Sequence, residues 1–342
     1  MAARSRNGGA APTMREVASL AQVSPMTVSR VLRQSPGVSQ ENRERVESAI
    51  KELGYRRNEL ARSLRQGQRT ETVGLIVTHL GNPFYARLAL GIESVLSQVG
   101  VRVMLTNTDG DVEREHAAVT DFSARRVDGL ILVPAGANQS YLEAELPSGP
   151  PVVMVARPPV GIDTDCVLVD DFGGAHAATR RLLALGHRNI GFLGNPPAVY
   201  TGSERYRGFC AALQEAGLSP RDEYVKRAQQ DIAPAEHAAA ELLALPEPPT
   251  AIFTTNNRNT LGAYRAIRRH HKSVTLAGFD DFELADMLNV PIIIVAYDPD
   301  EIGRRAATLL SERMAGGDAE QTLPARRTVV PTSIVEHSTS PS

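Results

Sequence analysis

The chain has 342 residues, of which 42% are hydrophobic and 22% charged, so it is long enough for two or three compact units with ordinary cores. It has two cysteines, Cys166 and Cys210, without CxxC or CxxH spacing, which argues against a disulfide framework and a structural zinc site and fits a reducing compartment. The polar first 12 residues lack the apolar segment of a signal peptide, and the longest apolar run, Val290–Tyr297, is far shorter than the roughly 20 residues of a membrane helix. We therefore expect a cytoplasmic protein that does not span a membrane.

Charge is distributed unevenly along the chain. Residues 1–69 contain 13 Lys and Arg against 6 Asp and Glu, whereas the remaining residues contain 24 against 33. A basic head before an acidic body favours binding of a polyanion by the head. A basic surface that is only hydrated would give the same counts, so charge alone leaves both interpretations open.

Three short helices are predicted within residues 13–57. Ser24 is a strong N-cap for the second helix, and Pro25 then occupies the first helical position, where its missing N–H costs nothing. The third helix is expected to begin after Ser39 and to end at Gly54.

Two helices joined by a three-residue turn and supported by a third form a helix-turn-helix. The second helix directs Val28, Val31 and Leu32 toward the core. Its outer face is basic and rich in hydroxyl groups and has no acidic residue, which a helical bundle of unrelated function would not require. The residues expected on this face are Pro25, Met26, Thr27, Ser29, Arg30 and Arg33.

A fourth, very short helix is predicted in residues 58–67, with Asn58 as N-cap and Gly67 as its end. About eight helical residues are marginal in water, so we expect this segment to be disordered in the free protein and ordered by a partner. Its exposed Leu60 and Leu64 would then contact that partner.

From Thr72 onward, apolar strands alternate with amphipathic helices. This pattern indicates buried parallel sheets with helices on both faces, and nine strands suit an α/β core of two doubly wound lobes better than one. The predicted strands are residues 72–77, 102–107, 129–134, 151–156, 166–171, 189–194, 250–255, 274–279 and 292–297. The predicted helices include residues 84–100, 174–186, 203–217, 234–245, 260–270 and 300–315.

Polar and aromatic residues follow several of these strands, where ligands bind in such folds. They offer amide, guanidinium and carboxylate groups beside aromatic rings, a mixture that suits a small polyhydroxylated ligand. The residues are Asn82, Phe84, Tyr85, Arg157, Arg205, Asn256, Asp280 and Asp281. Singly, each has a simpler explanation: Asn82 and Asp280 could cap helices or turns, and Arg205 could pair with a neighbour on its own helix.

Motifs of catalysis and of metal or cofactor binding are missing from the sequence, which contains no GxSxG, GxxxxGK[ST], GxGxxG or HExxH. Asp280 and Asp281 could form an acid–base pair, but adjacent side chains in a turn usually point apart. The missing motifs disfavour a sugar-acting enzyme. The basic head and the lack of a signal peptide favour a DNA-binding regulator over a solute-binding protein of a transporter.

Five segments carry a family resemblance: TMREVASLAQVSPMTVSRVL and VSQENRERVESAIKELGYRRN in the head, ARSLRQG in the short helix, and GLIVTHLGNPFYARLALGIE and TLAGFDD in the core. With them, residues 13 to about 335 resemble the lac/galactose repressor family of bacterial transcription regulators. The resemblance implies a periplasmic-binding-protein-like core and a repressor that binds a palindromic operator as a dimer. A small effector bound between the lobes would control it. The effector could weaken operator binding as an inducer or strengthen it as a corepressor, and the sequence leaves both alternatives open.

The resemblance also implies roles on DNA. The second helix would enter the major groove, where Arg30 reads a guanine, and Leu64 would wedge into the minor groove at the operator centre. Arg57 stands where the family commonly has a proline. The DNA-binding residues implied are Ser24, Pro25, Met26, Thr27, Ser29, Arg30, Arg33, Ser39, Asn58, Ala61 and Leu64.

The core is similar to periplasmic ribose-binding proteins, which implies a sugar or polyol as effector. The effector-binding residues implied are Asn82, Phe84, Tyr85, Arg157, Arg205, Asn256, Asp280 and Tyr297. Three positions depart from the family pattern: Ala156 and Asn257 each replace a common Asp, and Tyr297 replaces a common Gln. These departures exclude naming ribose as the effector.

Domain boundaries follow from these assignments. We expect a disordered tail, a DNA-binding head, a hinge segment, an N-terminal lobe, a C-terminal lobe and a second tail. In that order they are residues 1–12; 13–57; 58–70; 71–170 with 297–315; 171–296 with 316–336; and 337–342. The last residues hold no heptad repeat for a tetramerising helix, so a dimer is expected.

Overall fold

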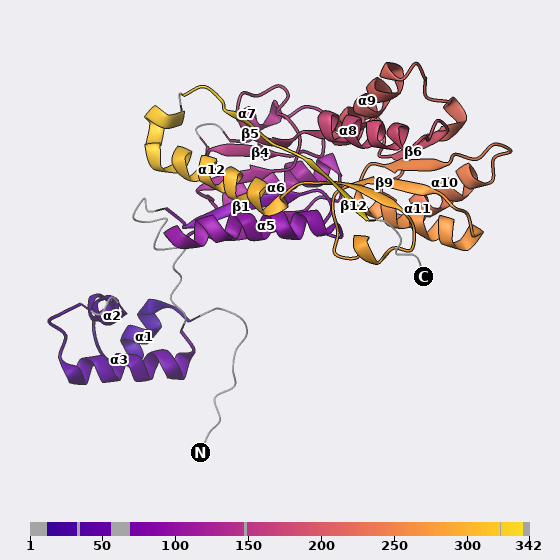
Figure 1. Ribbon diagram of the computed structural model, residues 1–342. Helices are drawn as coiled ribbons and strands as arrows, with labels where there is room; N and C mark the ends of the chain where they lie inside the picture. The colour runs from indigo at the N-terminus through magenta and orange to yellow at the C-terminus, as the bar shows by residue number, and fades with distance from the viewer. Residues whose placement is uncertain (1–11, 33–34, 56–68, 147–148, 322, 338–342) are drawn as a thin grey trace. The chain divides into compact units, whose positions relative to one another are not determined.

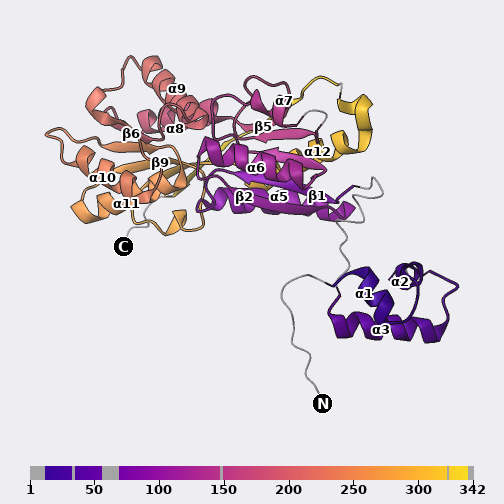
Figure 2. The same cartoon turned by 180° about the vertical axis from the view of Figure 1, so that it is seen from behind.

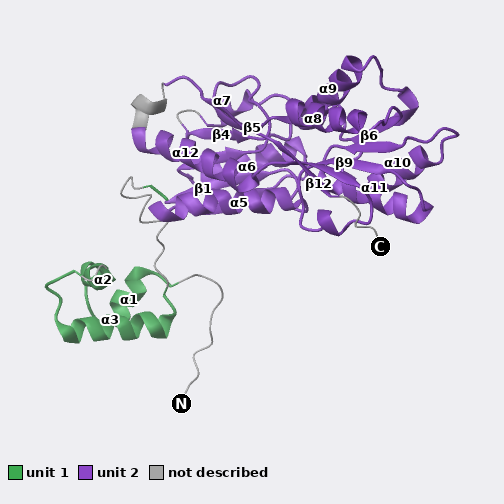
Figure 3. Ribbon diagram, in the orientation of Figure 1, with its two compact units in different colours: residues 1–70 green, residues 71–342 purple. Residues whose placement is uncertain are grey.

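The computed structural model describes residues 12–32, 35–55, 69–146, 149–321 and 323–337 (Figure 1). The chain divides into two compact units, Met1–Thr70 and Glu71–Ser342 (Figure 3). The hinge helix predicted in residues 58–67 lies outside the described residues. No helix in the described part of the chain is both long enough and apolar enough to cross a membrane.

The first unit has the three predicted helices. They are α1 (Met14–Leu20), α2 (Pro25–Leu32) and α3 (Gln40–Leu53). The hydroxyl of Ser24 accepts a hydrogen bond from the N–H of Thr27 at 3.1 Å, and that of Ser39 accepts one from Asn42 at 3.4 Å. Gly54, with φ of 64°, ends α3 in the left-handed conformation that glycine adopts without strain. The fully buried core residues are Val17, Val28 and Val46.

The N-terminal lobe of the second unit is a six-stranded parallel sheet in the order β11-β5-β4-β3-β1-β2. Its strands are β1 (Thr72–Val77), β2 (Arg102–Asn107), β3 (Gly129–Leu132), β4 (Val152–Val155), β5 (Asp165–Val169) and β11 (Arg327–Val330). Its helices are α5 (Pro83–Leu96), α6 (Val112–Ala124), α7 (Tyr141–Glu145) and α12 (Pro299–Gln321), with the 3-10 turn η1 (Ser97–Val99). Helices α5 and α12 pack on one face and α6 and α7 on the other (Figures 1 and 2).

The C-terminal lobe has a second six-stranded sheet in the order β12-β10-β9-β8-β6-β7, in which only β12 is antiparallel. Its strands are β6 (Ile190–Gly194), β7 (Val225–Arg227), β8 (Ala251–Thr254), β9 (Thr275–Phe279), β10 (Ile292–Ala296) and β12 (Ser333–His337). Its helices are α8 (Asp171–Ala184), α9 (Tyr200–Glu215), α10 (Ile232–Leu243) and α11 (Asn257–His270), with η2 (Asp222–Tyr224) and η3 (Ala285–Met287). Helices α8 and α9 cover one face, and α10 and α11 cover the other.

Two glycines allow α5 and α12 to pack closely. A Cβ at Gly91 would overlap the backbone carbonyl of Asp300, and one at Gly303 would overlap that of Leu88. The contact fixes the start of α5, which carries three of the predicted effector residues, beside the start of α12. It thereby positions one wall of the candidate site.

All nine predicted strands are present, and the structure adds β7, β11 and β12. The assignment of residues 316–336 to the C-terminal lobe is wrong for most of that range. Helix α12 runs to Gln321 on the N-terminal lobe, and β11 pairs in parallel with β5 there, so only β12 joins the other sheet. The short break at Pro331 and Thr332 is where the chain changes lobes, and sequence pattern alone does not say which sheet a strand joins.

The chain passes between the lobes three times: between β5 and α8, between β10 and α12, and between β11 and β12. Both sheets direct the carboxyl ends of their parallel strands toward these crossings. This is the place where open α/β sheets bind ligands.

Candidate functional site

Helix α2 presents the predicted outer face of the head. Ser24, Pro25 and Arg30 are exposed, and Met26 is 65% exposed. Thr27 and Ser29 are half-buried beside them. Within the described residues no acidic side chain pairs with Arg30, so its guanidinium is available to an external acceptor.

Two of the residues that the resemblance places on DNA, Ser24 and Ser39, also cap α2 and α3, in agreement with the helix starts expected from the sequence. An N-cap residue lies at the positive end of its helix, where a phosphate binds favourably. The other predicted DNA contacts, Arg33, Asn58, Ala61 and Leu64, lie outside the described residues.

The eight predicted effector residues line one cavity of about 430 Å³ between the lobes. The N-terminal lobe contributes residues from the start of α5 and from the loop after β4. The C-terminal lobe contributes residues from α9 and from the loops after β8, β9 and β10. In chain order they are Asn82, Phe84, Tyr85, Arg157, Arg205, Asn256, Asp280 and Tyr297. Asp281 is exposed and is not among the cavity residues, as expected for the neighbour of Asp280 in a turn.

Aromatic rings form one side of this cavity. Phe84 and Tyr85 meet edge to face with 4.9 Å between ring centroids, and Tyr297 lies 6.1 Å from Phe84. The hydroxyl groups of Tyr85 and Thr78 are 2.5 Å apart, which fixes the Tyr85 ring. Such rings suit the C–H face of a sugar while polar groups around them bind its hydroxyls.

A buried charge network lies beside these rings and shares Tyr297 with them. Arg205 donates from Nε to Asp171 Oδ1 at 2.7 Å, its Nη1 lies 3.4 Å from Asp280 Oδ1, and its guanidinium carbon lies 3.6 Å from the Phe279 ring centroid. The Tyr297 hydroxyl donates to Asp280 Oδ1 at 2.7 Å. The Arg205 guanidinium is therefore held between two carboxylates.

Burial shifts the acid–base equilibria of this network. It raises the pKa of Asp171 to about 6, against the opposing effect of Arg205. It also raises the pKa of Tyr297, and the neighbouring Asp280 carboxylate adds to that shift. Tyr297 is therefore a neutral hydrogen-bond donor throughout the physiological pH range.

Two hydrogen bonds join the lobes at the edge of the cavity. Asn257 donates from Nδ2 to Asn82 Oδ1 at 3.1 Å, and Arg258 donates from Nη1 to the carbonyl of Gly81 at 2.8 Å. Arg258 is itself oriented by Asp231, whose Oδ1 accepts from its Nε at 2.7 Å. These bonds favour the arrangement of the lobes seen here.

Comparison with known proteins identifies both units. Residues 13–58 match the family model of bacterial regulatory proteins of the lacI family, and residues 70–335 match that of periplasmic binding proteins and the sugar-binding domain of the LacI family. The chain belongs to the LacI family. It is thus a DNA-binding transcriptional regulator, and the head sets it apart from a transporter's solute-binding protein and from an enzyme.

Individual relatives agree with this assignment. The ribose operon repressor of Escherichia coli K12 is 33% identical over 90% of this chain and 95% of its own length. A putative ribose operon repressor from Burkholderia thailandensis has a TM-score of 0.71 and 34% identity over 79% of this chain and all of that one. A complex of the regulator CelR with cellobiose has a TM-score of 0.69 and 32% identity over 96% of this chain and 99% of that one.

Several residues that shape the cleft were not predicted from the sequence. Asp171, the partner of Arg205, was placed at the end of a predicted strand, and Asp231 and Arg258 were not singled out. Asp171 is the second residue after β5 and the first of α8, so ending the predicted strand at Val169 and applying the strand-end rule there would have found it. Asn82 has both of the roles considered for it, because its side chain caps α5 and also lines the cleft.

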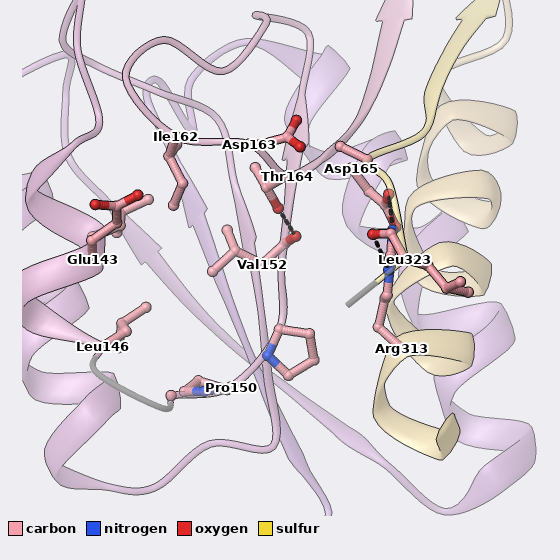
Figure 4. A pocket seen from close by; sticks show the side chains of 14 residues that line it. Glu143, Leu146, Pro150, Val152, Ile162, Asp163, Thr164, Asp165, Arg313 and Leu323 are labelled. Atoms are coloured by element: carbon pink, nitrogen blue, oxygen red, sulfur yellow. Dashed lines mark hydrogen bonds and ion pairs between the residues drawn. The ribbon is translucent and has the colours of Figure 1, made fainter. Parts of the chain in front are cut away.

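A second cavity, of about 340 Å³, lies at the opposite end of the N-terminal sheet (Figure 4). Its polar wall is the buried pair of Asp165 and Arg313, joined by bonds of 2.8 and 2.9 Å. Arg313 also donates to the carbonyls of Leu323 and Pro324, so these groups are satisfied within the protein. Within the described residues, no group of three or more His, Cys, Asp or Glu side chains is placed to hold a metal ion.

Proposed function

We propose that this protein is a repressor that binds a palindromic operator as a homodimer and responds to a small sugar-like effector in the cleft. The convergence of eight strand-end residues on one interlobe cavity carries this proposal, together with the exposed face of α2. It acts on operator DNA in the cytoplasm. The lac repressor dimer bound to operator and anti-inducer, 25% identical over 96% of this chain with a TM-score of 0.76, supports this assembly.

On DNA, residues 13–57 form the reading head and residues 58–70 the segment that orders on the operator. Arg30 reads a guanine from the major groove, while Met26 and Pro25 make apolar contacts with bases. The hydroxyls and the remaining polar groups bind phosphates. In the hinge, which lies outside the described residues, Leu64 is the wedge and Ala61 and Asn58 are its neighbours.

In the cleft, the rings of Phe84, Tyr85 and Tyr297 receive the apolar face of the effector. Arg157, Arg205, Asn256, Asp280 and Asn82 bind its polar groups. Because the effector contacts both lobes, it stabilises one arrangement of the lobes over another. That difference in affinity, typically about 1–3 kcal/mol, is the most by which it changes operator binding.

Binding of the full-length protein to DNA from beside its own gene tests the proposal. At low salt we expect protection of a two-fold symmetric site, and affinity that falls steeply with salt. A thermal-shift panel of sugars and polyols should then contain a compound that raises the melting temperature and changes operator affinity. Absence of affinity for any duplex DNA would refute the regulatory function.

A further inference from the structure

The three arginines that line the cleft differ in how their charge is compensated. Arg205 lies between two carboxylates, at 2.7 Å from Asp171 and 3.4 Å from Asp280. Arg258 donates to Asp231 at 2.7 Å. Both cations are therefore neutralised within the protein.

Arg157 lacks such a partner. Its one hydrogen bond runs from Nη1 to the backbone carbonyl of Pro134, and within the described part of the chain no carboxylate forms an ion pair with it. The residue before it, Ala156, is buried and supplies no charge. Arg157 is half-buried and lines the cavity. Its remaining guanidinium N–H groups are therefore available to the effector.

The first turn of α9 adds a second preference for negative charge. Its N-cap is Val199, which has no side-chain group to accept a hydrogen bond from the first turn. Val199 and Thr201 both line the cavity, so this positive end of a 16-residue helix opens into the cleft. Helix N-termini of this kind bind carboxylates and phosphates.

We propose that the natural effector carries an anionic group, a carboxylate or a phosphate, that pairs with Arg157. The inference rests on the proposed function and narrows its effector class from sugars in general to sugar acids or sugar phosphates. A neutral sugar would leave the Arg157 charge uncompensated as the lobes close and exclude water, which is unfavourable. Asp280 and Asp231 are each already paired with arginine and therefore do not oppose an anion strongly. Asp109, a third carboxylate of the cavity lining, is exposed and lies 3.2 Å from His79 Nδ1, so solvent screens its charge.

Calorimetric titration of the full-length protein with matched ligands tests this. The series are D-ribose, D-ribonate and D-ribose 5-phosphate, and D-glucose, D-gluconate and D-glucose 6-phosphate, so that carboxylate and phosphate are distinguished from each other and from the neutral parent. We expect one anionic member to bind about ten-fold or more tightly than its parent, because charge-assisted hydrogen bonds are about twice as strong as neutral ones.

Arg157→Gln should remove this preference: it should lower the affinity for the anionic member at least about ten-fold more than the affinity for the neutral parent, because glutamine can still hydrogen-bond to hydroxyl groups but carries no charge. Arg180→Gln is the matched control, since Arg180 is exposed on α8 away from the cavity and its loss changes the net charge equally. High salt should weaken binding of the anion and not of the parent. Circular dichroism checks that both variants are folded.

Three results would overturn the inference: a neutral parent that binds as tightly as its anions, equal losses for both ligands in Arg157→Gln, or no binding by any anionic member. A neutral sugar that releases the operator regardless of Arg157 would leave the proposed function intact. Failure to bind operator DNA would instead remove the proposed function itself.

Discussion

Asn257 donates a hydrogen bond to Asn82 across the cleft, although 175 positions separate them in the chain. The Asn82 oxygen that accepts it at 3.1 Å also accepts the N–H of Phe84 at 3.0 Å, so one carbonyl caps α5 and joins the lobes. This bond needs an amide donor at residue 257, where a carboxylate could not donate. The interlobe hydrogen bond therefore explains why residue 257 is an asparagine, which the sequence alone did not reveal.

Asn257→Asp should weaken effector binding by about ten-fold, the upper end of the range expected for loss of one neutral hydrogen bond, because the new carboxylate also repels the Asn82 oxygen. The carboxylate would face the Asn82 oxygen and shift the lobes toward a more open arrangement. Asp is favourable in the first turn of α11, so the fold should be retained. Asn257→Ala, which removes the donor without adding charge, should show a smaller effect in the same titration, and equal affinities for all three proteins would contradict the role of this bond.

Asp280→Ala should abolish the response to the effector and leave operator affinity without effector close to normal. Asp280 accepts the Tyr297 hydroxyl and lies beside Arg205, so its loss disorders the polar wall of the cleft while the head is unchanged. Operator binding with and without effector, measured by fluorescence anisotropy, checks this. The exposed neighbour provides the control: Asp281→Ala should respond normally, and a normal response in Asp280→Ala would place the effector elsewhere.

Arg30→Ala should relax base preference at one operator position in each half-site. A bidentate contact to guanine is worth about 1–3 kcal/mol of discrimination, so preference there should fall about 5- to 150-fold. The control is Lys51→Ala, which removes the charge of an exposed residue on α3 and should not change base preference at any operator position. Binding to a library of single-base operator variants separates the two, and uniform weakening by Arg30→Ala would indicate a phosphate contact instead.

Two buried carboxyls should give opposite pH dependences of stability. The pKa of Asp171 is raised by burial from 3.8 to about 6, so the folded state binds the extra proton and its contribution to the free energy of unfolding falls as pH rises through that window. Burial also acts to raise the pKa of Asp165, but hydrogen bonds from Arg313 and Arg326 outweigh it and lower the pKa. The Asp165 contribution is therefore present above the ordinary carboxyl pKa of 3.8 and is lost as pH falls through the lowered value.

Urea unfolding followed by circular dichroism, chosen because the chain has no tryptophan, checks these signs. Asp165→Asn should cost about 3–5 kcal/mol near neutral pH, because it leaves Arg313 buried without its partner, and the cost should shrink in acid. For Asp171→Asn, the free energy of unfolding of the variant should instead rise relative to that of the natural protein as pH rises from about 4 to 6. Parallel pH profiles for the two variants would contradict this assignment.

Local pattern was sufficient for most of the fold and for the position of the cleft. Apolar runs marked all nine predicted strands, and residues just beyond them, such as Asn82 and Asp280, converge because parallel strands end at the same edge of a sheet. Strands β11 and β12 were missed because they are short and partly exposed, without a continuous apolar run. Their assignment to different sheets depends on tertiary pairing rather than on local preference.

Interactions between distant segments were not predictable in the same way. The pairs Arg205–Asp171 and Asn257–Asn82 depend on how two helices or two lobes approach each other. Asn82 is also a helix cap, and Asp171 and Asn257 are also first-turn residues, so the sequence gives no reason to expect a further contact for them. Spatial pairing of this kind requires coordinates.

The three crossings between the lobes limit how this sensor can be divided. Since β11 completes one sheet and β12, two residues later, completes the other, neither lobe corresponds to a continuous stretch of chain. A single proteolytic cut or a simple truncation therefore cannot yield either lobe as a separate folded product. Loss of β12 alone would uncover β10 and destabilise the C-terminal lobe, whose first helix, α8, begins more than 160 positions earlier.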